Sequence, residues 1–285
     1  MERAYLPPAR SWQPLVELAL EEDIGPGDAT TPVVVEIGRR GEALIEARQQ
    51  LVVCGLDVAA AVFHALDPTL RYQARLPEGS VSRAGEVLAE LDGDLRAILA
   101  GERTALNFLG RMCGVASWTR RFVDAVAGTG VRIVDTRKTL PGWRVLDKYA
   151  TAVGGAVNHR VGLFDGILLK DNHVALAGGI VPAVQGARRN VGHLVKIEVE
   201  VDTLEQLDDA LELGVDVVLL DNMDLETLRE AVRRARGRAV TEASGGIRPE
   251  TVREVGETGV DLISLGWLTH SAPSLDVGFD VPAFR

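Results

Sequence analysis

The chain has 285 residues, 46% of them hydrophobic and 25% charged, which is an ordinary composition for a soluble globular protein of one large or two modest domains. The formal net charge of −10 argues against nucleic acid or an anionic membrane as a partner, because both require a basic surface. No apolar run approaches a membrane span, and the N-terminal stretch lacks the apolar core of a secretory signal, so we expect a cytoplasmic protein. The spacing of the two cysteines, Cys54 and Cys113, fits neither a disulfide framework nor a metal site.

The first part of the chain has the pattern of a mixed α and β domain. Its apolar periodicity predicts helices over residues 15–22 and 56–66, and strands over 41–53, 69–76 and 85–91. A long helical segment follows over residues 95–126. Gly110 and Gly114 weaken this segment, which could therefore be two helices.

From about residue 130 the pattern becomes a regular alternation of apolar runs and helical gaps. The runs predict seven strands, over residues 131–135, 152–157, 166–170, 194–200, 215–220, 238–243 and 260–265. Thr203 and Gln206 fit a capping box, Pro249 fits the first position of a helix, and Gly214 and Gly259 fit helix C-terminal turns. The repeated αβ unit predicts a parallel sheet closed into a small barrel, with an open doubly wound sheet as the alternative.

Polar groups follow the strands of this expected barrel, at the end where the active sites of such barrels lie. Basic side chains follow the first three strands: Arg137, Lys138, His159, Arg160 and Lys170. Acidic side chains, Glu200 and Asp221, follow the next two. Independent surface charges would not sort by sign in this way. The arrangement suits a substrate with several carboxylates or phosphates and a group that becomes cationic in the transition state.

The expected mouth also contains groups with more than one interpretation. Glu198 and Glu200 share a face of one strand with Lys196, so a buried Lys–Glu pair is a structural alternative for part of the cluster. No His or Cys spacing fits a zinc held by the protein. Carboxylates at the mouth could instead hold Mg²⁺ jointly with substrate phosphates, which is how this ion is usually bound.

Glycines follow the last two strands. Ser244, Gly245 and Gly246, ahead of the helix expected near Pro249, resemble a phosphate cradle made by backbone groups, and Leu265-Gly266 ends the next strand. A plain strand-to-helix turn that requires positive φ is the alternative.

Seven segments of the chain match a known family in order: ALEEDIGPGDATT, ERTALNFLGRMCGVAS, DTRKTLPGWRVLDKYA, GGAVNHRVGLFDGILLKDNH, IEVEVDTLEQL, LLDN and EASGGI. They resemble quinolinate phosphoribosyltransferase, also called nicotinate-nucleotide pyrophosphorylase (carboxylating). The resemblance covers essentially the whole chain, and the long motifs are specific. Trp143 is a small departure that lies between the charged positions.

The resemblance implies a pentosyltransferase of NAD biosynthesis. Members transfer phosphoribose from 5-phosphoribosyl 1-pyrophosphate to the ring nitrogen of quinolinate and release the 2-carboxylate as CO₂, giving nicotinate mononucleotide and pyrophosphate. Mg²⁺ accompanies the donor, and no organic cofactor is expected. The implied fold is an N-terminal α/β sandwich domain over residues 1–113 and a seven-stranded α/β barrel over 114–285, whose tail after 272 could pack on the first domain. A homodimer or higher homo-oligomer is implied, with Arg103 reaching the partner's site.

The resemblance also assigns roles to residues. The catalytic residues are expected to be Lys138, Lys170, Glu200 and Asp221. The substrate-binding residues are expected to be Arg103, Thr136, Arg137, Lys138, His159, Arg160, Lys170, Glu200, Asp221, Ser244, Gly245, Gly246, Leu265 and Gly266. Glu200 and Asp221 would bind ribose hydroxyls, directly or through Mg²⁺, and stabilise an oxocarbenium-like transition state.

Two other functions are compatible with the sequence. Lys170, at the end of a strand, could be the nucleophile of a Schiff-base aldolase or lyase. A binding or regulatory paralogue associated with molybdate uptake also resembles this family. Such a paralogue would be expected to lose some mouth residues, whereas every expected charge is present here.

Overall fold

The structure, a computed structural model, describes residues 4–282 and consists of two compact units. Unit 1 contains the chain up to Arg120, Thr139–Gly155 and the chain from Leu268 onward. Unit 2 contains Arg121–Lys138 and Ala156–Trp267. Each unit is therefore built from separate stretches of sequence, and the domain boundary expected between residues 113 and 114 stays a prediction.

Unit 1 is built on an antiparallel sheet with the strand order β12-β1-β5-β3. Its strands are β1 (Arg40–Ala47), β3 (Arg71–Ala74), β5 (Val87–Asp94) and β12 (Val277–Asp280). A two-stranded ribbon pairs β2 (Leu51–Val52) with β4 (Val81–Ser82). Alternate residues of β1, namely Ala43, Ile45 and Ala47, are fully buried, as expected for a strand with one face on the core. The tail beyond residue 272 thus contributes an edge strand to this sheet.

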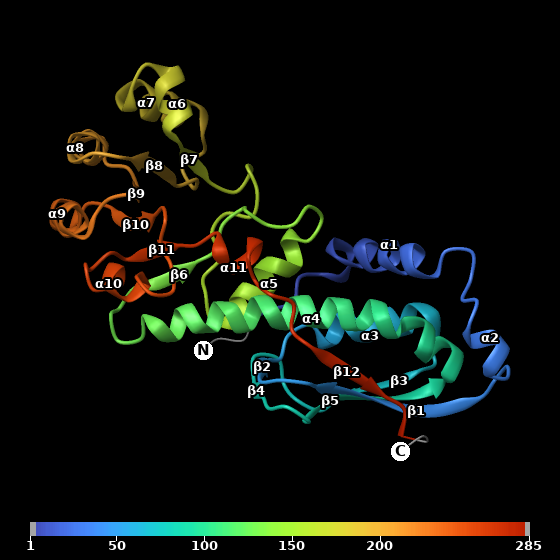
Figure 1. Cartoon of the computed structure of the whole chain (residues 1–285). Helices are drawn as coiled ribbons and strands as arrows, with labels where there is room; N and C mark the ends of the chain where they lie inside the picture. The colour runs from blue at the N-terminus through green and yellow to red at the C-terminus, as the bar shows by residue number, and fades with distance from the viewer. Residues whose placement is uncertain (1–3, 283–285) are drawn as a thin grey trace. The chain divides into compact units, whose positions relative to one another are not determined.

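Unit 1 has α3 and α4 side by side on one face of the sheet (Figure 1). Its helices are η1 (Ala9–Ser11), α1 (Gln13–Ile24), α2 (Thr31–Val34), α3 (Leu56–Leu66), α4 (Leu95–Ala125) and α5 (Arg144–Gly154). α4 is a single helix, so Gly110 and Gly114 do not divide it. They admit a second segment instead, because a Cβ at Gly114 would lie 1.9 Å from the carbonyl oxygen of Pro273.

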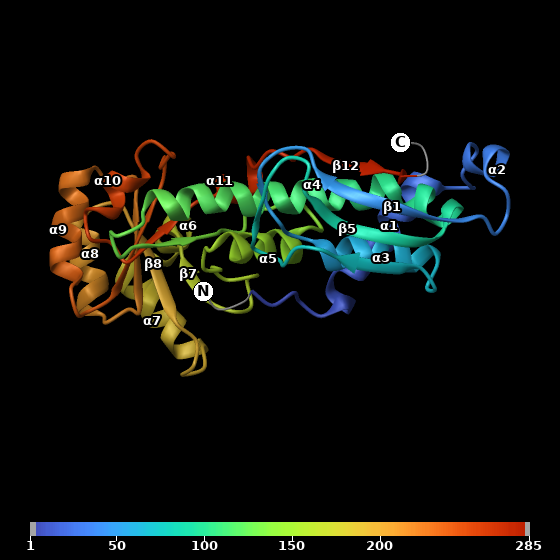
Figure 2. The ribbon, with the colours of Figure 1, turned by 90° about the horizontal axis from the view of Figure 1, so that it is seen from below.

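Unit 2 is a six-stranded parallel sheet with the order β6-β11-β10-β9-β8-β7. The strands are β6 (Arg132–Val134), β7 (Ile167–Leu169), β8 (Ile197–Val201), β9 (Val217–Asp221), β10 (Val240–Ser244) and β11 (Leu262–Ser264). The helices are α6 (Asp171–Ala177), α7 (Ile180–Asn190), α8 (Leu204–Glu212), α9 (Leu225–Ala235) and α10 (Val252–Gly256), and α11 (Trp267–His270) lies where the chain returns to unit 1. Figure 2 shows α8 and α9 on the outer side of the strands, as in Figure 1.

The second of the seven expected strands, over residues 152–157, is wrong. α5 continues to Gly154, and Gly155 ends it with a φ of 105°, because a Gly-Gly pair suits a left-handed helix end. Only Val157 makes an isolated parallel bridge, to Val134. The sheet accordingly has six strands and one bridge among the residues described.

The helix signals were correct in part. Gly214 and Gly259 have positive φ angles of 62° and 91°, as predicted for residues that end helices. Thr203 caps α8 by accepting from the Gln206 backbone, but the Gln206 side chain accepts from Asp202 instead of closing a capping box. The helix predicted to begin at Pro249 begins at Val252, because a turn held by Thr251 and Arg248 precedes it. None of the helices within residues 4–282 is long and apolar enough to cross a membrane.

Candidate active site at the carboxyl ends of the barrel strands

The acidic and basic strand ends of unit 2 meet directly. Lys170 directly follows β7, and its Nζ lies 2.7 Å from Glu200 Oε2 on the neighbouring strand β8. The lysine side chain is 49% exposed and the glutamate side chain 11% exposed. The ammonium group can therefore be reached by a ligand, while the carboxylate is largely enclosed.

Two arginines from different strand ends lie close enough to affect each other. Burial, followed by the charge of Arg137, lowers the pKa of Arg160. Arg160 Nη1 also donates to the carbonyl oxygen of Gly166 at 2.9 Å. Two guanidinium groups in one neighbourhood repel, so an anion between them would be bound favourably.

The segment that carries Arg160 is held by a buried carboxylate at the end of β6. Asp135 is fully buried, and its Oδ1 accepts from the His159 backbone at 2.8 Å. Its other oxygen accepts from Asn158 Nδ2 at 2.7 Å. Asp135 thus fixes the main chain immediately before Arg160.

His159 points to two buried glutamates. Its Nε2 lies 3.1 Å from Glu198 Oε2 and 3.8 Å from Glu242 Oε1. Burial, followed by the charge of Glu198, raises the pKa of Glu242 to about 7. These three are close enough to hold a metal ion, and the structure describes no other such group of His, Cys, Asp and Glu. The alternative Lys196–Glu198 pair does not describe this cluster, because Lys196 is exposed and Glu198 pairs with His159.

Sequence reasoning missed Glu242. A signal existed, because Glu242 lies two residues before Ser244 in β10 and so shares its face of the sheet. A charged residue inside a buried strand is rare unless it is paired.

A cavity of about 480 Å³ adjoins this cluster. His159, Arg160, Glu198 and Glu242 line it, together with residues at the beginnings of strands such as Arg132. The lining does not include Lys138, Lys170, Glu200 or Asp221. The cavity therefore lies mostly in the interior of the barrel, next to the predicted mouth. The candidate site is defined instead by the charged side chains at the strand ends.

The expected phosphate cradle contains a close contact between two strand ends. Gly245 has a φ of 92°, and a Cβ there would lie 2.3 Å from Asn222 Oδ1. Asn222, at a φ of 53°, donates from its backbone to the Ser244 carbonyl at 3.0 Å and from its side chain to Asp221 at 2.7 Å. Asn222 therefore links the expected ribose-binding carboxylate to the glycine loop, a role that the sequence pattern did not indicate.

The remaining expected residues lie in more ordinary surroundings. Thr136 Oγ1 accepts from the Lys138 backbone at 3.1 Å, and Lys138 is exposed. Gly246 has a φ of 61°, and the side chain of Leu265 is buried, so Leu265 can offer a ligand only its backbone. Gly266 follows it directly in the chain.

Arg103 lies on α4 in unit 1 with its side chain 63% exposed, 3.9 Å from Glu102. Its expected role in a partner's site stays a prediction. His173 Nδ1 accepts from the Lys170 backbone N–H at 2.9 Å and so helps to begin α6.

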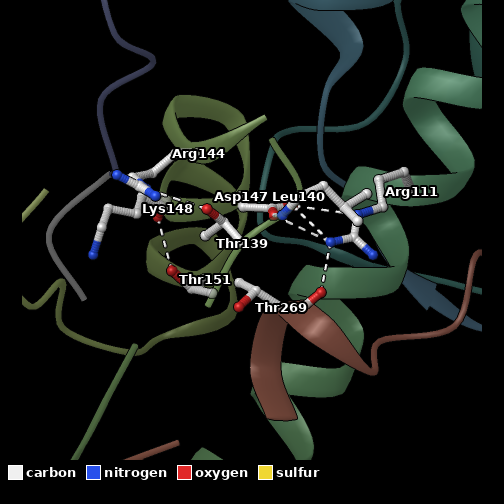
Figure 3. A network of polar contacts seen from close by, with 8 residues as sticks. All are labelled: Arg111, Thr139, Leu140, Arg144, Asp147, Lys148, Thr151 and Thr269. Carbon is white, nitrogen blue, oxygen red and sulfur yellow. Dashed lines mark hydrogen bonds and ion pairs between the residues drawn. The ribbon is translucent and has the colours of Figure 1, made fainter. Parts of the chain in front are cut away.

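A second polar network lies within unit 1 and includes Leu140 and Thr269, which each come shortly after a site segment in the sequence (Figure 3). Arg111 on α4 donates to both oxygens of the buried Asp147 on α5, at 3.0 and 3.1 Å. It also donates to the Thr269 carbonyl at 2.6 Å, and the backbone of Leu140 donates to Asp147 at 3.4 Å. Leu140 follows the Arg137-Lys138 pair in sequence, and Thr269 follows Gly266.

A parallel sheet with outer helices and charge-sorted strand ends defines an α/β-barrel protein equipped for a polyanionic ligand. Residues 28–113 match the quinolinate phosphoribosyl transferase N-terminal domain, and residues 115–280 match its C-terminal domain. The chain therefore belongs to the quinolinate phosphoribosyl transferase family, as the sequence motifs predicted. The expected α/β fold class is confirmed, with six paired strands and one bridge in place of the seven expected strands.

Similar proteins match nearly all of the chain. A probable nicotinate-nucleotide pyrophosphorylase (carboxylating) of Bacillus subtilis is 43% identical over 261 residues, which is 91% of this chain and 90% of the relative. The enzyme of that name from Mycobacterium leprae is 42% identical over 93% of this chain and 95% of its own length. The structure of the Francisella tularensis nicotinate-nucleotide pyrophosphorylase has a TM-score of 0.94 at 35% identity and covers 99% of both chains.

Proposed function

We propose that this chain transfers phosphoribose from 5-phosphoribosyl 1-pyrophosphate to quinolinate, with loss of one carboxylate as CO₂ and formation of nicotinate mononucleotide and pyrophosphate. The observation that carries the proposal is the Lys170–Glu200 pair, in a unit whose strand ends also carry Arg137 and Arg160. Membership of the family supports the same reaction.

Quinolinate would bind through its two carboxylates. Arg137 and Arg160 suit this role, because a guanidinium group matches a carboxylate with two parallel hydrogen bonds. Lys138 would add a further positive charge. Arg103 would complete the site from a second copy of the chain, which would make a homodimer or a higher homo-oligomer the working form.

The ribose would be held on the acidic side. Glu200 and Asp221 would accept from its hydroxyl groups and stabilise the positive charge that develops as pyrophosphate departs. Their oxygen donors lie on neighbouring strands and fit Mg²⁺, which prefers carboxylates together with substrate phosphates. Mg²⁺ would neutralise charge on the pyrophosphate, and Lys170 would exchange its contact with Glu200 for one with an anionic substrate group.

The 5-phosphate would bind at the glycine loops. Gly245 and Gly246 both have positive φ angles, which bring backbone groups close to a ligand without a side chain in the way. Ser244 and Gly266 would complete this cradle, beside the buried Leu265. After transfer, the pyridinium ring would accept the electrons released by loss of CO₂, so this step needs no organic cofactor.

The direct test is a turnover assay with quinolinate, 5-phosphoribosyl 1-pyrophosphate and Mg²⁺ that follows both CO₂ and nicotinate mononucleotide. We expect both products in equal amounts and no turnover when nicotinate replaces quinolinate. Product formation from nicotinate alone would contradict the proposed substrate. Reductive trapping of a carbonyl substrate on Lys170 would instead support a Schiff-base lyase, and quinolinate binding without turnover would support a regulatory paralogue.

A further inference from the structure

We propose that His159 is a positioning residue, held between the backbone amide of Arg160 and the carboxylate of Glu198, and that Glu198 shares this role. This replaces the expectation that His159 contacts a substrate anion itself. The expected effect of His159 on catalysis rests on the function proposed above. Its geometric part can be tested whether or not the chain turns over quinolinate.

The hydrogen bonds of the ring determine where its proton lies. The Arg160 backbone N–H donates to His159 Nδ1 at 2.7 Å, so Nδ1 must offer a lone pair. A neutral imidazole carries its single proton on the other nitrogen. Nε2 therefore carries the proton and donates it to Glu198 Oε2, 3.1 Å away. Both ring nitrogens are engaged inside the protein.

This arrangement disfavours the two other roles that the ring could take. To donate to a substrate carboxylate, Nε2 would have to leave Glu198, whose side chain is only 10% exposed. To bind a metal ion, Nε2 would have to lose its proton while Nδ1 still accepts from Arg160, which leaves an imidazole with no proton at all. Metal-bound histidines usually donate from the nitrogen that does not bind the metal.

The ring and the main chain are fixed from opposite sides. Asp135, fully buried, accepts from the His159 backbone at 2.8 Å, while Glu198 accepts from the end of the ring. Arg160 follows directly, and its Nη1 donates to the Gly166 carbonyl at 2.9 Å. The direction in which the Arg160 guanidinium leaves the main chain therefore depends on the anchored His159. Glu242, 2% exposed and 3.8 Å from Nε2, closes the same cluster from β10.

The test combines a spectroscopic and a kinetic measurement on the full-length protein. In ¹⁵N–¹H spectra that correlate ring protons with both ring nitrogens, His159 is assigned by its absence from the H159Q spectrum. We expect the neutral Nε2–H tautomer, unchanged when quinolinate is added. The proposal would be overturned if His159 were an imidazolium or the Nδ1–H tautomer, whatever the activity. It would also be overturned if the addition of quinolinate converted His159 to one of these forms.

The kinetic arm compares E198Q with E198A. Glutamine keeps a carbonyl acceptor for the Nε2–H, so we expect E198Q to retain activity within about threefold, whereas E198A should lose about tenfold or more in kcat/KM. The loss should lie in KM for quinolinate and leave KM for 5-phosphoribosyl 1-pyrophosphate unchanged. Equal losses in both variants, or a loss confined to the donor KM, would contradict the positioning role.

Two controls separate the alternatives. Circular dichroism and thermal melting establish that E198A is folded, and H159Q, which keeps a donor near the Nε2 position, should retain more activity than H159A. Zn²⁺ is titrated into the wild-type protein and into E198A. We expect the two proteins to show the same zinc binding, or none. Zinc binding that depends on Glu198 would show that the cluster is a metal site and would overturn the proposal.

Discussion

Lys170 Nζ lies 2.7 Å from Glu200 Oε2, so the cationic and anionic sides of the candidate site neutralise each other before any ligand arrives. The two residues belong to adjacent parallel strand ends, where Leu169 pairs with Val199. In the reaction proposed above, an anionic substrate group would bind Lys170 in place of Glu200, and Glu200 would then be available to a ribose hydroxyl or a developing positive charge. One exchange of partners would thus prepare both sides of the site.

The first prediction concerns this pair. K170A should lose at least about a hundredfold in turnover, because it removes a charge at the reacting groups. Its stability should change little, since an ion pair with a half-exposed lysine contributes about 1 kcal/mol or less. Turnover and urea unfolding measured on the same preparation test both parts. Near-normal turnover of K170A would refute the catalytic role.

The second prediction concerns the dependence of stability on pH. Burial raises the pKa of Glu242 to about 7, above its ordinary value of 4.5, so the folded chain keeps this proton when the unfolded chain has lost it. Glu242 therefore weakens the folded state increasingly as pH rises from about 4.5 to 7, and fully above that range. E242Q removes the penalty and should raise the free energy of unfolding by on the order of 3 kcal/mol at pH 8 and by very little at pH 4.5. The matched control is the exposed Glu250→Gln. A stabilisation of E242Q that is the same at both pH values would contradict the argument.

The third prediction concerns the glycine loop. G245A adds a Cβ 2.3 Å from Asn222 Oδ1 at a φ of 92°, so it should both strain the loop and displace Asn222. We expect a loss of about 1–3 kcal/mol in the free energy of unfolding and a higher KM for 5-phosphoribosyl 1-pyrophosphate. G178A is the control, because Gly178 has a φ of 86° and nothing within 4 Å of its added Cβ. Equal effects of the two substitutions would show that the contact with Asn222 contributes neither to the free energy of unfolding nor to donor binding.

The fourth prediction concerns the network of Figure 3. Arg111 and Asp147 have side chains that are 12% and 1% exposed. D147A leaves the Arg111 guanidinium and the Leu140 N–H without this acceptor, and should cost about 3–5 kcal/mol in the free energy of unfolding. The exposed pair of Arg75 and Glu90 is the control, since E90A should cost about 1 kcal/mol or less. A comparable loss in both variants would argue against a special role for the buried pair.

Strand-end chemistry was predictable because it depends on local order along the chain. The basic residues after β6 and β7 and the acidic residues of β8 and β9 follow from hydrophobic runs and from the direction shared by parallel strands. The helix expected over residues 56–66 has those bounds in α3. The strand predicted over residues 152–157 was wrong, because a helix end that contains Gly-Gly and a short buried strand have the same local composition.

Contacts between strands were not predictable in this way. His159 meets Glu198 and Glu242 because β8, β9 and β10 lie in one particular register, in which Glu198 is opposite Val217 and Val217 is opposite Val240. A shift of one residue would turn either glutamate to the other face. Asn222 likewise meets Gly245 only because β9 and β10 end together. Register is set by the whole sheet, so no local pattern reveals these pairs.

The edge strand β12 has a consequence for how the chain is made. Its pairing with β1 joins Ala47 to Val277, and Arg48 reaches Asp280 across 232 positions of sequence. During synthesis, therefore, the edge of β1 that pairs with β12 stays unpaired while every strand of unit 2 emerges from the ribosome. Such distant pairings form slowly and leave an edge available to other chains. The sheet whose first strands come earlier in this sequence is thus the sheet that is completed last, and β1 keeps an unpaired edge until residue 277 is available.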